Sequence, residues 1–345
     1  MSKIDSKYTI AIIMPVRNEE KFLGQTLDQV YLQDFPMDKV EVVIADGFST
    51  DKTREIAESF KGRFGSLKVL DNPGRLPSSG RNVGVKNSTA PYILILDGHT
   101  YIPSKNFLSD IIAKFKETGA QCLCRPQPLL PPDINEFEKS VALCRGSSLG
   151  HKPGSEIYAE FEGIVDPTSS GAMYTREVFE KIGYFDEKFD ACEDVDFNYR
   201  VKLAGFQSYL SPKLTVFYYP RSSITGLWKQ MNRYGMGRFK FALKHKIFSP
   251  IQWFAGAAVF GFFAALVLSF MFTPVFELFR SAIAFYLLII LAFSTYLAVD
   301  KKHIGCLIYG LLIFPTIHFG LGFGFLKVMV TYFKYKDFKE LNKEW

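Results

Sequence analysis

The stretch Tyr92-Ile93-Leu94-Ile95-Leu96-Asp97-Gly98-His99-Thr100 decides the fold of this chain. Its first five residues are apolar or aromatic, which is typical of a strand buried on both faces of a parallel sheet. The run ends at Asp97 and His99, and open α/β sheets bind ligands at the carboxyl ends of their strands. Taken alone, the stretch is equally consistent with an ordinary polar turn. Asp97 and His99 are also candidate ligands for a divalent cation, and such a cation can hold a diphosphate.

Two further apolar segments, 8–14 and 40–45, have the composition of strands and also end in polar residues. Segments with helical spacing separate the strands, so we expect an α/β fold with a mostly parallel sheet covered by helices. The carboxyl ends of such strands lie along one rim, where a nucleotide-sized ligand explains the polar residues. Those residues are Arg17, Glu19 and Asp46. The glycine-rich motifs of dinucleotide-binding and P-loop proteins do not occur.

A second acidic group lies far along the chain. Glu193 and Asp194 precede a segment with helical apolar spacing, so both are expected near the positive N-terminus of a helix. Acidic residues are common in the first turn of helices. The functional interpretation is a general base held at the helix end.

Composition divides the chain into four parts. Residues 1–220 have the mixed composition of a soluble α/β domain, and 221–250 form a basic amphipathic segment suited to a membrane interface. Residues 251–333 are apolar and are predicted to hold two to three transmembrane helices, followed by a polar tail, 334–345. The basic loop at 300–303 places the N-terminal domain in the cytoplasm by the positive-inside rule, which predicts a multi-pass protein of the cell membrane.

The last apolar segment, 304–326, leaves two topologies open. A third full span carries the basic tail outside, against the positive-inside rule. A break of the segment into a re-entrant or interfacial pair, at Pro315, His318 and the glycines Gly320, Gly322 and Gly324, would keep the tail inside. Of the two topologies, three full spans are preferred. The net charge of +6 over 345 residues is modest, and its basic cluster lies beside the apolar region. This pattern favours an anionic membrane surface over nucleic acid as a partner.

Six motifs, each weak alone, resemble in their order the family 2 glycosyltransferases with the GT-A fold. The similarity covers roughly the first 240 residues, and it is closest to membrane-associated enzymes of the succinoglycan-biosynthesis ExoA type. The motifs are Pro15-Val16-Arg17-Asn18-Glu19, Asp46-Gly47-Phe48-Ser49-Thr50-Asp51, Gly80-Arg81-Asn82-Val83-Gly84, Asp97-Gly98-His99, Gly183-Tyr184-Phe185-Asp186 and Glu193-Asp194.

The resemblance implies a role for each residue of the nucleotide site. Pro15, Arg17 and Glu19 are expected to line the base and ribose pocket, with Asp46 accepting a hydrogen bond from the base, expected to be uracil. Arg81 is expected to help hold the diphosphate.

The resemblance also implies a metal. Asp97 and His99 stand where the family usually has Asp-x-Asp, so His99 replaces the second carboxylate. Neutral imidazole still binds divalent cations, and the expected cofactor is Mn²⁺ or Mg²⁺.

Asp194 is expected to be the catalytic base, supported by Glu193, in a reaction that inverts an α-linked donor to a β-linkage. Gln230-Met231-Asn232-Arg233-Tyr234 resembles the Gln-x-x-Arg-Trp motif of processive members, with tyrosine in place of tryptophan. Gln230, Arg233 and Tyr234 are therefore expected to contact the acceptor or a diphosphate. The alternative is an interfacial helix whose basic and aromatic residues meet the headgroup layer.

Together these features predict an inverting hexosyltransferase that moves one sugar from a UDP-sugar to a membrane lipid-linked saccharide. The lipid is expected to be a polyprenyl diphosphate, and the pathway polysaccharide or glycolipid biosynthesis. A processive polysaccharide synthase is disfavoured by the few candidate spans and the missing tryptophan. A non-catalytic nucleotide-sugar-binding membrane protein is disfavoured because Asp97 and Asp194 are present.

Overall fold

The computed structural model describes residues 6–150, 156–158, 160–247 and 250–335. Contacts divide the chain into two compact units. The first, here called the N-terminal unit, comprises residues 1–131 and 154–219. The second, the C-terminal unit, comprises 132–153 and 220–345. Most of the polar tail expected at 334–345 lies outside the described residues.

The N-terminal unit contains, within the described residues, an eight-stranded sheet in the spatial order β3-β2-β1-β4-β8-β6-β9-β7. The strands β3, β2, β1 and β4 are parallel, which confirms the expected α/β sheet, whereas β8 runs antiparallel to both β4 and β6. Two short strands, β5 and β10, form a separate antiparallel pair. The strands are β1 (Ile10–Val16), β2 (Val40–Asp46), β3 (Ser66–Asp71), β4 (Tyr92–Ile95), β5 (Thr100–Tyr101), β6 (Cys122–Cys124), β7 (Gly163–Ile164), β8 (Gly171–Thr175), β9 (Ser208–Leu210) and β10 (Phe217–Tyr218).

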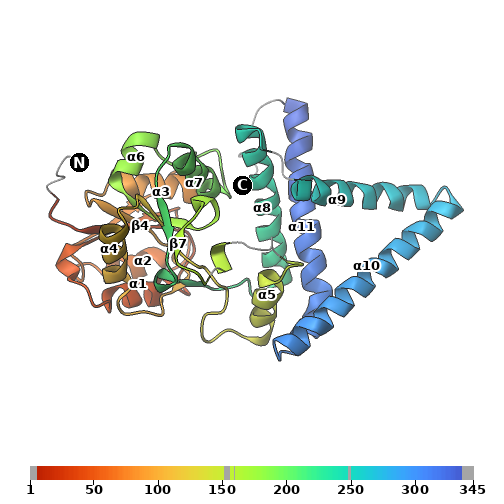
Figure 1. The fold of residues 1–345 in the computed structure, drawn as a ribbon, viewed down its shortest axis with the longest axis horizontal. Helices are drawn as coiled ribbons and strands as arrows, with labels where there is room; N and C mark the ends of the chain where they lie inside the picture. The colour runs from red at the N-terminus through yellow and green to blue at the C-terminus, as the bar shows by residue number, and fades with distance from the viewer. Residues whose placement is uncertain (1–5, 151–155, 159, 248–249, 336–345) are drawn as a thin grey trace. The chain divides into compact units, whose positions relative to one another are not determined.

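Helices cover both faces of this sheet (Figure 1). Strand β1 shows why: Ile10, Ile12 and Met14 belong to one core, and the alternate residues Ala11 and Ile13 belong to the other. The first core includes residues of α1, α2 and α4, and the second includes residues of α3, α6 and α7. The helices are α1 (Leu23–Tyr31), α2 (Thr53–Ser59), α3 (Pro77–Lys86), α4 (Phe107–Thr118), α6 (Arg176–Ile182) and α7 (Glu193–Leu203), with 3₁₀ turns η1 (Met37–Lys39), η2 (Glu156–Tyr158), η3 (Pro167–Ser169) and η4 (Pro212–Leu214).

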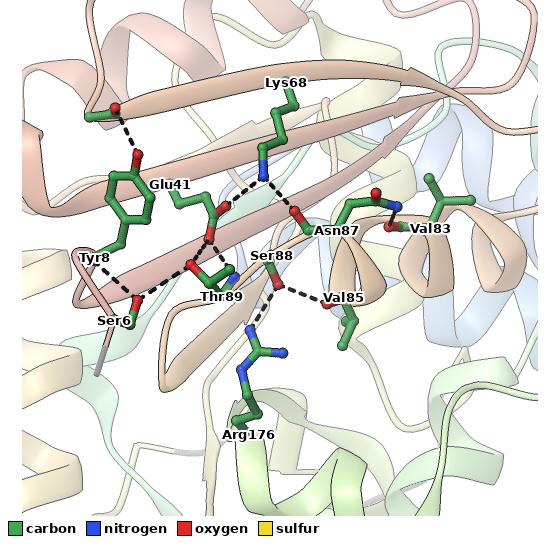
Figure 2. Close-up of polar contacts among 11 residues, drawn as sticks. Ser6, Tyr8, Glu41, Lys68, Val83, Val85, Asn87, Ser88, Thr89 and Arg176 are labelled. Atoms are coloured by element: carbon green, nitrogen blue, oxygen red, sulfur yellow. Dashed lines mark hydrogen bonds and ion pairs between the residues drawn. The ribbon is translucent and has the colours of Figure 1, made fainter. Parts of the chain in front are cut away.

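A polar network holds the amino-terminal side of the parallel strands (Figure 2). The carboxylate of Glu41 is fully buried, and it accepts hydrogen bonds from Lys68 Nζ at 3.0 Å and from the backbone N–H of Thr89 at 2.7 Å. Arg176 donates from Nη2 to Ser88 Oγ at 3.0 Å. Because these side chains satisfy one another, this end of the sheet is a structural support, and the carboxyl end remains the candidate for a ligand.

The C-terminal unit is helical in its described residues. Two of its helices, α10 and α11, are long and apolar enough to cross a membrane, by length and composition. The helix α11 runs unbroken through Pro315 and the glycines, so the suggested break within 304–326 is wrong. The helices are α5 (Glu136–Gly146), α8 (Ile224–His245), α9 (Pro250–Ser269), α10 (Thr273–Asp300) and α11 (Gly305–Tyr335).

The glycines of α11 serve close helix packing. A Cβ added to Gly324 meets the carbonyl oxygen of Asn232 on α8 at 2.0 Å, and one added to Gly320 meets Met231 Cβ at 2.7 Å. In return, a Cβ on Gly235 of α8 meets the carbonyl oxygen of Leu321 at 2.1 Å. Small residues spaced four apart let two helix backbones approach each other closely. Glycines in such a pattern therefore do not by themselves indicate a kink.

Candidate active site

The loops that follow β1 and β2 are joined by hydrogen bonds. The Asn18 N–H donates to Ser49 Oγ at 2.9 Å, and Asn18 Oδ1 accepts from the Thr50 N–H at 2.9 Å. The Glu19 N–H donates to Thr53 Oγ1 at 2.6 Å. Asn18 adopts a left-handed backbone conformation with φ 54°, which turns the chain away from the strand. The two strand ends therefore form one continuous rim.

Asp46 and Arg17 both lie on this rim, but Asp46 is buried and Arg17 is exposed. Asp46 is 3% exposed, and its Oδ1 accepts hydrogen bonds from the N–H and the hydroxyl of Ser49 at 3.1 and 2.6 Å. Its Oδ2 lies 3.6 Å from Arg54 Nη1. Arg17 is exposed, and its aliphatic stem lies against Gly47, where an added Cβ would be 3.3 Å away. Asp46 thus shapes the loop, and Arg17 offers its side chain to solvent.

Arg81 connects two distant segments of the predicted site. It lies on α3, is 8% exposed, and places Nη1 2.9 Å from Glu193 Oε1 and Nη2 3.7 Å from Asp97 Oδ1. Its guanidinium also lies 5.3 Å from the centre of the Phe185 ring. Nε of Arg81 is buried and has no hydrogen-bond partner among the described residues. One arginine therefore joins the end of β4 to the start of α7, which are far apart in sequence.

The approach of α3 to the strands depends on Gly80. A Cβ at Gly80 would lie 2.8 Å from Pro15 Cβ. Asn82, two residues further along the same helix, binds both the N–H and the carbonyl of Phe185 at 2.9 Å. The motifs around Pro15, Arg81 and Phe185 are therefore brought together by a single helix.

Asp97 is held as an anion. Burial acts to raise its pKa, but Arg81, His99 and Arg125 and a hydrogen bond from the Tyr218 hydroxyl outweigh that effect, so the pKa lies below the usual range. Its side chain is 25% exposed. An ionised, partly accessible carboxylate at a strand end is suited to bind a cation.

The chain bends between Asp97 and His99. His99 Nδ1 lies 2.8 Å from Glu19 Oε1. Metal-binding histidines usually donate their second ring nitrogen to a carboxylate, which is the arrangement of this pair. Asp97 and His99 both contact Tyr218, the carboxylate by a hydrogen bond and the imidazole edge-on at 6.0 Å between ring centres.

The donor set fits a divalent cation only in part. Among the described residues, no three His, Cys, Asp or Glu side chains gather as a metal site. Asp97 and His99 therefore supply at most two protein ligands, and the oxygens of a bound diphosphate would have to supply others. This is how Mg²⁺ is commonly held, by one or two protein groups together with substrate phosphates and water.

Glu193 and Asp194 begin α7, as the sequence predicts. The preceding residue, Cys192, is in the left-handed region with φ 63°, which turns the chain abruptly into the helix. Glu193 is 5% exposed, and burial raises its pKa to about 7, opposed by Arg81 and reinforced by Asp194. Asp194 is half-buried, and its Oδ1 accepts from the Val195 N–H at 2.8 Å. The more accessible carboxylate is Asp194, which suits it to exchange a proton with a ligand.

Two residues at this site escaped the sequence reasoning. Arg125, at the end of β6, is 1% exposed and donates from Nη2 to Ile95 O and to Tyr218 Oη, both at 3.3 Å. Tyr218 lies on the two-residue strand β10, and burial raises the pKa of its phenol. The sequence signal for Arg125 was only a charge directly after an apolar triplet, and Tyr218 had none.

The three residues expected to meet the acceptor lie in the C-terminal unit, on α8. Gln230 Oε1 accepts from Arg145 Nη1 at 3.1 Å, and the Tyr234 ring lies 5.8 Å from the Arg145 guanidinium. Arg233 follows on the same helix and is half-buried. The structure therefore gathers the nucleotide-site and acid residues in one unit, and the acceptor residues with Arg145 in the other.

Comparison with known proteins adds to this geometry. Residues 11–183 match the family described as Glycosyl transferase family 2. The succinoglycan biosynthesis protein ExoA of Rhizobium meliloti is 30% identical over 262 residues, which is 74% of this chain and 78% of that protein. A dolichyl N-acetyl-α-D-glucosaminyl phosphate 3-β-D-2,3-diacetamido-2,3-dideoxy-β-D-glucuronosyltransferase of Methanococcus voltae is 30% identical over 66% of this chain and 72% of its own length.

Solved structures share the fold. The mannosyltransferase PcManGT from Pyrobaculum calidifontis, in complex with GDP-Man and Mn²⁺, aligns with a TM-score of 0.57 and 17% identity over 89% of this chain and 88% of its own. S. aureus TarS 1-349, in complex with UDP-GlcNAc, aligns with a TM-score of 0.52 and 18% identity over 94% and 92%. At these identities the likeness concerns the fold.

Proposed function

Because this chain belongs to glycosyl transferase family 2, we propose that it is an inverting hexosyltransferase that moves one sugar from a UDP-sugar to a lipid-linked saccharide. The single observation that carries the proposal is the position of Arg81. Its guanidinium meets Asp97 at the strand end and Glu193 at the helix start, within 3.7 and 2.9 Å. The positively charged guanidinium between these carboxylates can bind a diphosphate close to Asp194, the candidate base.

The donor is proposed to lie along the rim formed by the ends of β1, β2 and β4. Pro15, Arg17 and Glu19 would line the pocket for its base and ribose. Asp46 would accept a hydrogen bond from uracil in addition to the hydrogen bonds that it accepts from Ser49. Support comes from the shared rim and from the solved neighbour that holds UDP-GlcNAc.

Asp194 is proposed to be the general base. It removes the proton from the acceptor hydroxyl, whose oxygen attacks the anomeric carbon as the bond to the diphosphate breaks. Attack from the face opposite the leaving group converts an α-linked donor to a β-linked product. Glu193 supports the base through Arg81, and Arg81 also neutralises charge that develops on the departing diphosphate.

Asp97 and His99 are proposed to hold a divalent cation, Mn²⁺ or Mg²⁺, which when bound supplies positive charge to the leaving diphosphate. Glu19 orients His99, and Tyr218 orients Asp97. The Mn²⁺ in the complex of the Pyrobaculum mannosyltransferase supports this assignment.

The acceptor is proposed to be a saccharide on a polyprenyl diphosphate, in polysaccharide or glycolipid biosynthesis. The name of the Methanococcus relative includes a dolichyl glucosaminyl phosphate, and the Rhizobium relative is named for succinoglycan biosynthesis. The two apolar helices α10 and α11 support a substrate met at a membrane.

We further propose a multi-pass protein of the cell membrane with a cytoplasmic catalytic domain, residues 1–220, and an interfacial segment, 221–250. Two to three helices within 251–333 would span the bilayer. The loop between α10 and α11 carries Lys301 and Lys302, and it contacts α5 because His303 Nε2 lies 2.9 Å from Ser140 Oγ. Basic loops favour the cytoplasmic side.

The test is release of UDP from a panel of nucleotide sugars by the purified full chain in detergent. The panel is run with Mn²⁺, with Mg²⁺ and with a chelator, in the presence of membrane lipid extract as a source of acceptor. The proposal expects metal-dependent release from one UDP-sugar. Release from a GDP-sugar alone would contradict the uracil assignment, and binding of a donor without any turnover would favour a non-catalytic binding protein.

A further inference from the structure

Arg145 is a buried arginine in an unusual environment. It lies in the last turn of α5, is 8% exposed, and belongs to the C-terminal unit. Its Nη1 donates to Gln230 Oε1 at 3.1 Å, and its guanidinium carbon lies 5.8 Å from the centre of the Tyr234 ring. Gln230 and Tyr234 are four residues apart on α8, so they share one face of that helix.

The charge of Arg145 is only partly balanced. Among the described residues, its guanidinium contacts the amide oxygen of Gln230 and the ring of Tyr234, and neither partner is a carboxylate. An amide oxygen, a ring face and the carbonyl end of α5 each offer a partial negative charge. Burying a charge without an opposite charge is costly, so the arrangement favours a bound anion.

The geometry selects the kind of anion. A guanidinium is a planar fork that binds two oxygens of a phosphate at once. The Gln230 amide has N–H groups to donate while its oxygen accepts from Arg145. Tyr234 is 37% exposed, so the cluster reaches the surface of the unit. The same unit carries α10 and α11, and the phosphate esters of lipids lie at the surface of the membrane that such helices would cross.

We propose that Arg145, Gln230 and Tyr234 form a phosphate-binding site, with Arg145 as its charged ligand, for the diphosphate of a polyprenyl-linked acceptor. The inference rests on the proposed function for the identity of the lipid, while the phosphate chemistry rests on the cluster alone. A phospholipid headgroup carries the same phosphate ester, so the test separates the two sources.

The experiment measures binding to the full chain in neutral detergent. Farnesyl diphosphate is the soluble probe of a polyprenyl diphosphate, farnesol is the same chain without phosphate, and phosphatidylglycerol is the headgroup probe. Binding is compared for the wild type, Arg145→Gln, Gln230→Glu and the matched control Lys229→Gln. Lys229 is exposed on α8 beside Gln230, so its loss removes the same charge without touching the cluster.

Arg145→Gln is expected to weaken farnesyl diphosphate binding by about tenfold or more, as loss of a charged hydrogen-bonding partner implies. Gln230→Glu is expected to do the same, because the carboxylate of a glutamate, which is nearly isosteric with glutamine, would form an ion pair with the Arg145 guanidinium. This second variant keeps the test valid if Arg145→Gln does not fold. Lys229→Gln is expected to change binding by less than about twofold, and farnesol binding should be unchanged in all variants.

Equal weakening by Arg145→Gln and Lys229→Gln would overturn the proposal, since it would reflect overall charge. Weakening confined to phosphatidylglycerol would overturn the polyprenyl assignment and give the site to a headgroup. UDP release is measured on the same preparations. If the wild type releases no UDP yet binds farnesyl diphosphate through Arg145, the proposed function fails and the phosphate site stands.

Discussion

At the scale of single residues, Arg81 holds the candidate active site together. Its two terminal nitrogens meet different carboxylates, Glu193 and Asp97, and its third nitrogen is buried without a partner among the described residues. Only a forked cation reaches both acids at once. The charge balance and the geometry of the site therefore depend on this side chain.

Replacing Arg81 with lysine tests this dependence. A lysine has one ammonium group and cannot bridge two carboxylates, so we expect Arg81→Lys to lower kcat/KM for UDP release by about tenfold to a hundredfold. Arg176→Lys is the control, because Arg176 also links two segments but at the opposite end of the sheet (Figure 2). The interpretation fails if both variants lose activity in proportion to lost thermal stability.

Glu193 predicts a dependence of stability on pH. Burial raises its pKa from 4.5 to about 7, so between these values the folded chain binds more protons than the unfolded chain. The free energy of unfolding contributed by this group therefore falls as pH rises from about 4.5 to 7. Glu193→Gln removes the titration, and its melting temperature relative to the wild type should rise between pH 5 and pH 8. A constant difference across that range would refute the shifted pKa.

The candidate site residues that can be predicted from the sequence are those marked by a local pattern of neighbouring residues. Asp97 ends an apolar run, and Glu193 and Asp194 begin a periodic helix, so their positions follow from local pattern. Arg125 and Tyr218 join the site only through the pairing of short strands. Pairing between distant segments leaves no periodic signal in the chain.

At the scale of elements, α3 is fixed to β1 by glycines. A Cβ at Gly84 would lie 2.1 Å from Ile13 Cγ2, closer than any side chain tolerates. The helix begins at Pro77, because proline fits the first turn of a helix. Close approach of this helix delivers Arg81 to the strand end.

Gly84→Ala is therefore expected to destabilise the protein by about 1–3 kcal/mol through overpacking. Gly24→Ala is the matched control, since Gly24 also lies in a helix but an added Cβ would meet Ile56 Cγ2 at an ordinary 3.5 Å. There, alanine should be neutral or stabilising by up to about 1 kcal/mol. Chemical unfolding of both variants measures the difference, and equal effects would contradict the packing argument.

The sequence pattern predicted the helices and strands better than it predicted which of them pack or pair with one another. The parallel half of the sheet follows from alternating strands and helices, whereas the antiparallel strand β8 between β4 and β6 does not. The glycines of α11 suggested a break but serve contact with α8. A glycine looks the same in sequence whether it bends a helix or admits a neighbour.

At the scale of the whole molecule, the chain forms two units that are not continuous in sequence. Residues 132–153 leave the N-terminal unit and contribute α5 to the C-terminal unit. Composition alone placed the boundary between the two domains near residue 220. No change in hydropathy marks the segment 132–153, which belongs to the C-terminal unit. Arg145 is absent from the residues expected from the sequence for this reason, whereas its partners Gln230 and Tyr234 are among them.

The C-terminal unit predicts firm membrane attachment. Because α10 and α11 are long and apolar enough to span, the full chain should stay in the membrane fraction after washing with alkaline carbonate or high salt. A protein held only by the basic segment 221–250 would be released by salt, which screens surface charge. Release by either wash would contradict the spanning topology.

The most direct test of the central claim compares turnover and binding in Asp194→Asn with the donor that the wild type uses. The proposed base predicts loss of UDP release by about 10²–10⁴-fold, with donor affinity within a few fold of the wild type. Glu180→Gln, which removes an exposed carboxylate of α6, should leave both quantities unchanged. Turnover by Asp194→Asn at the wild-type rate would show that Asp194 is not the base.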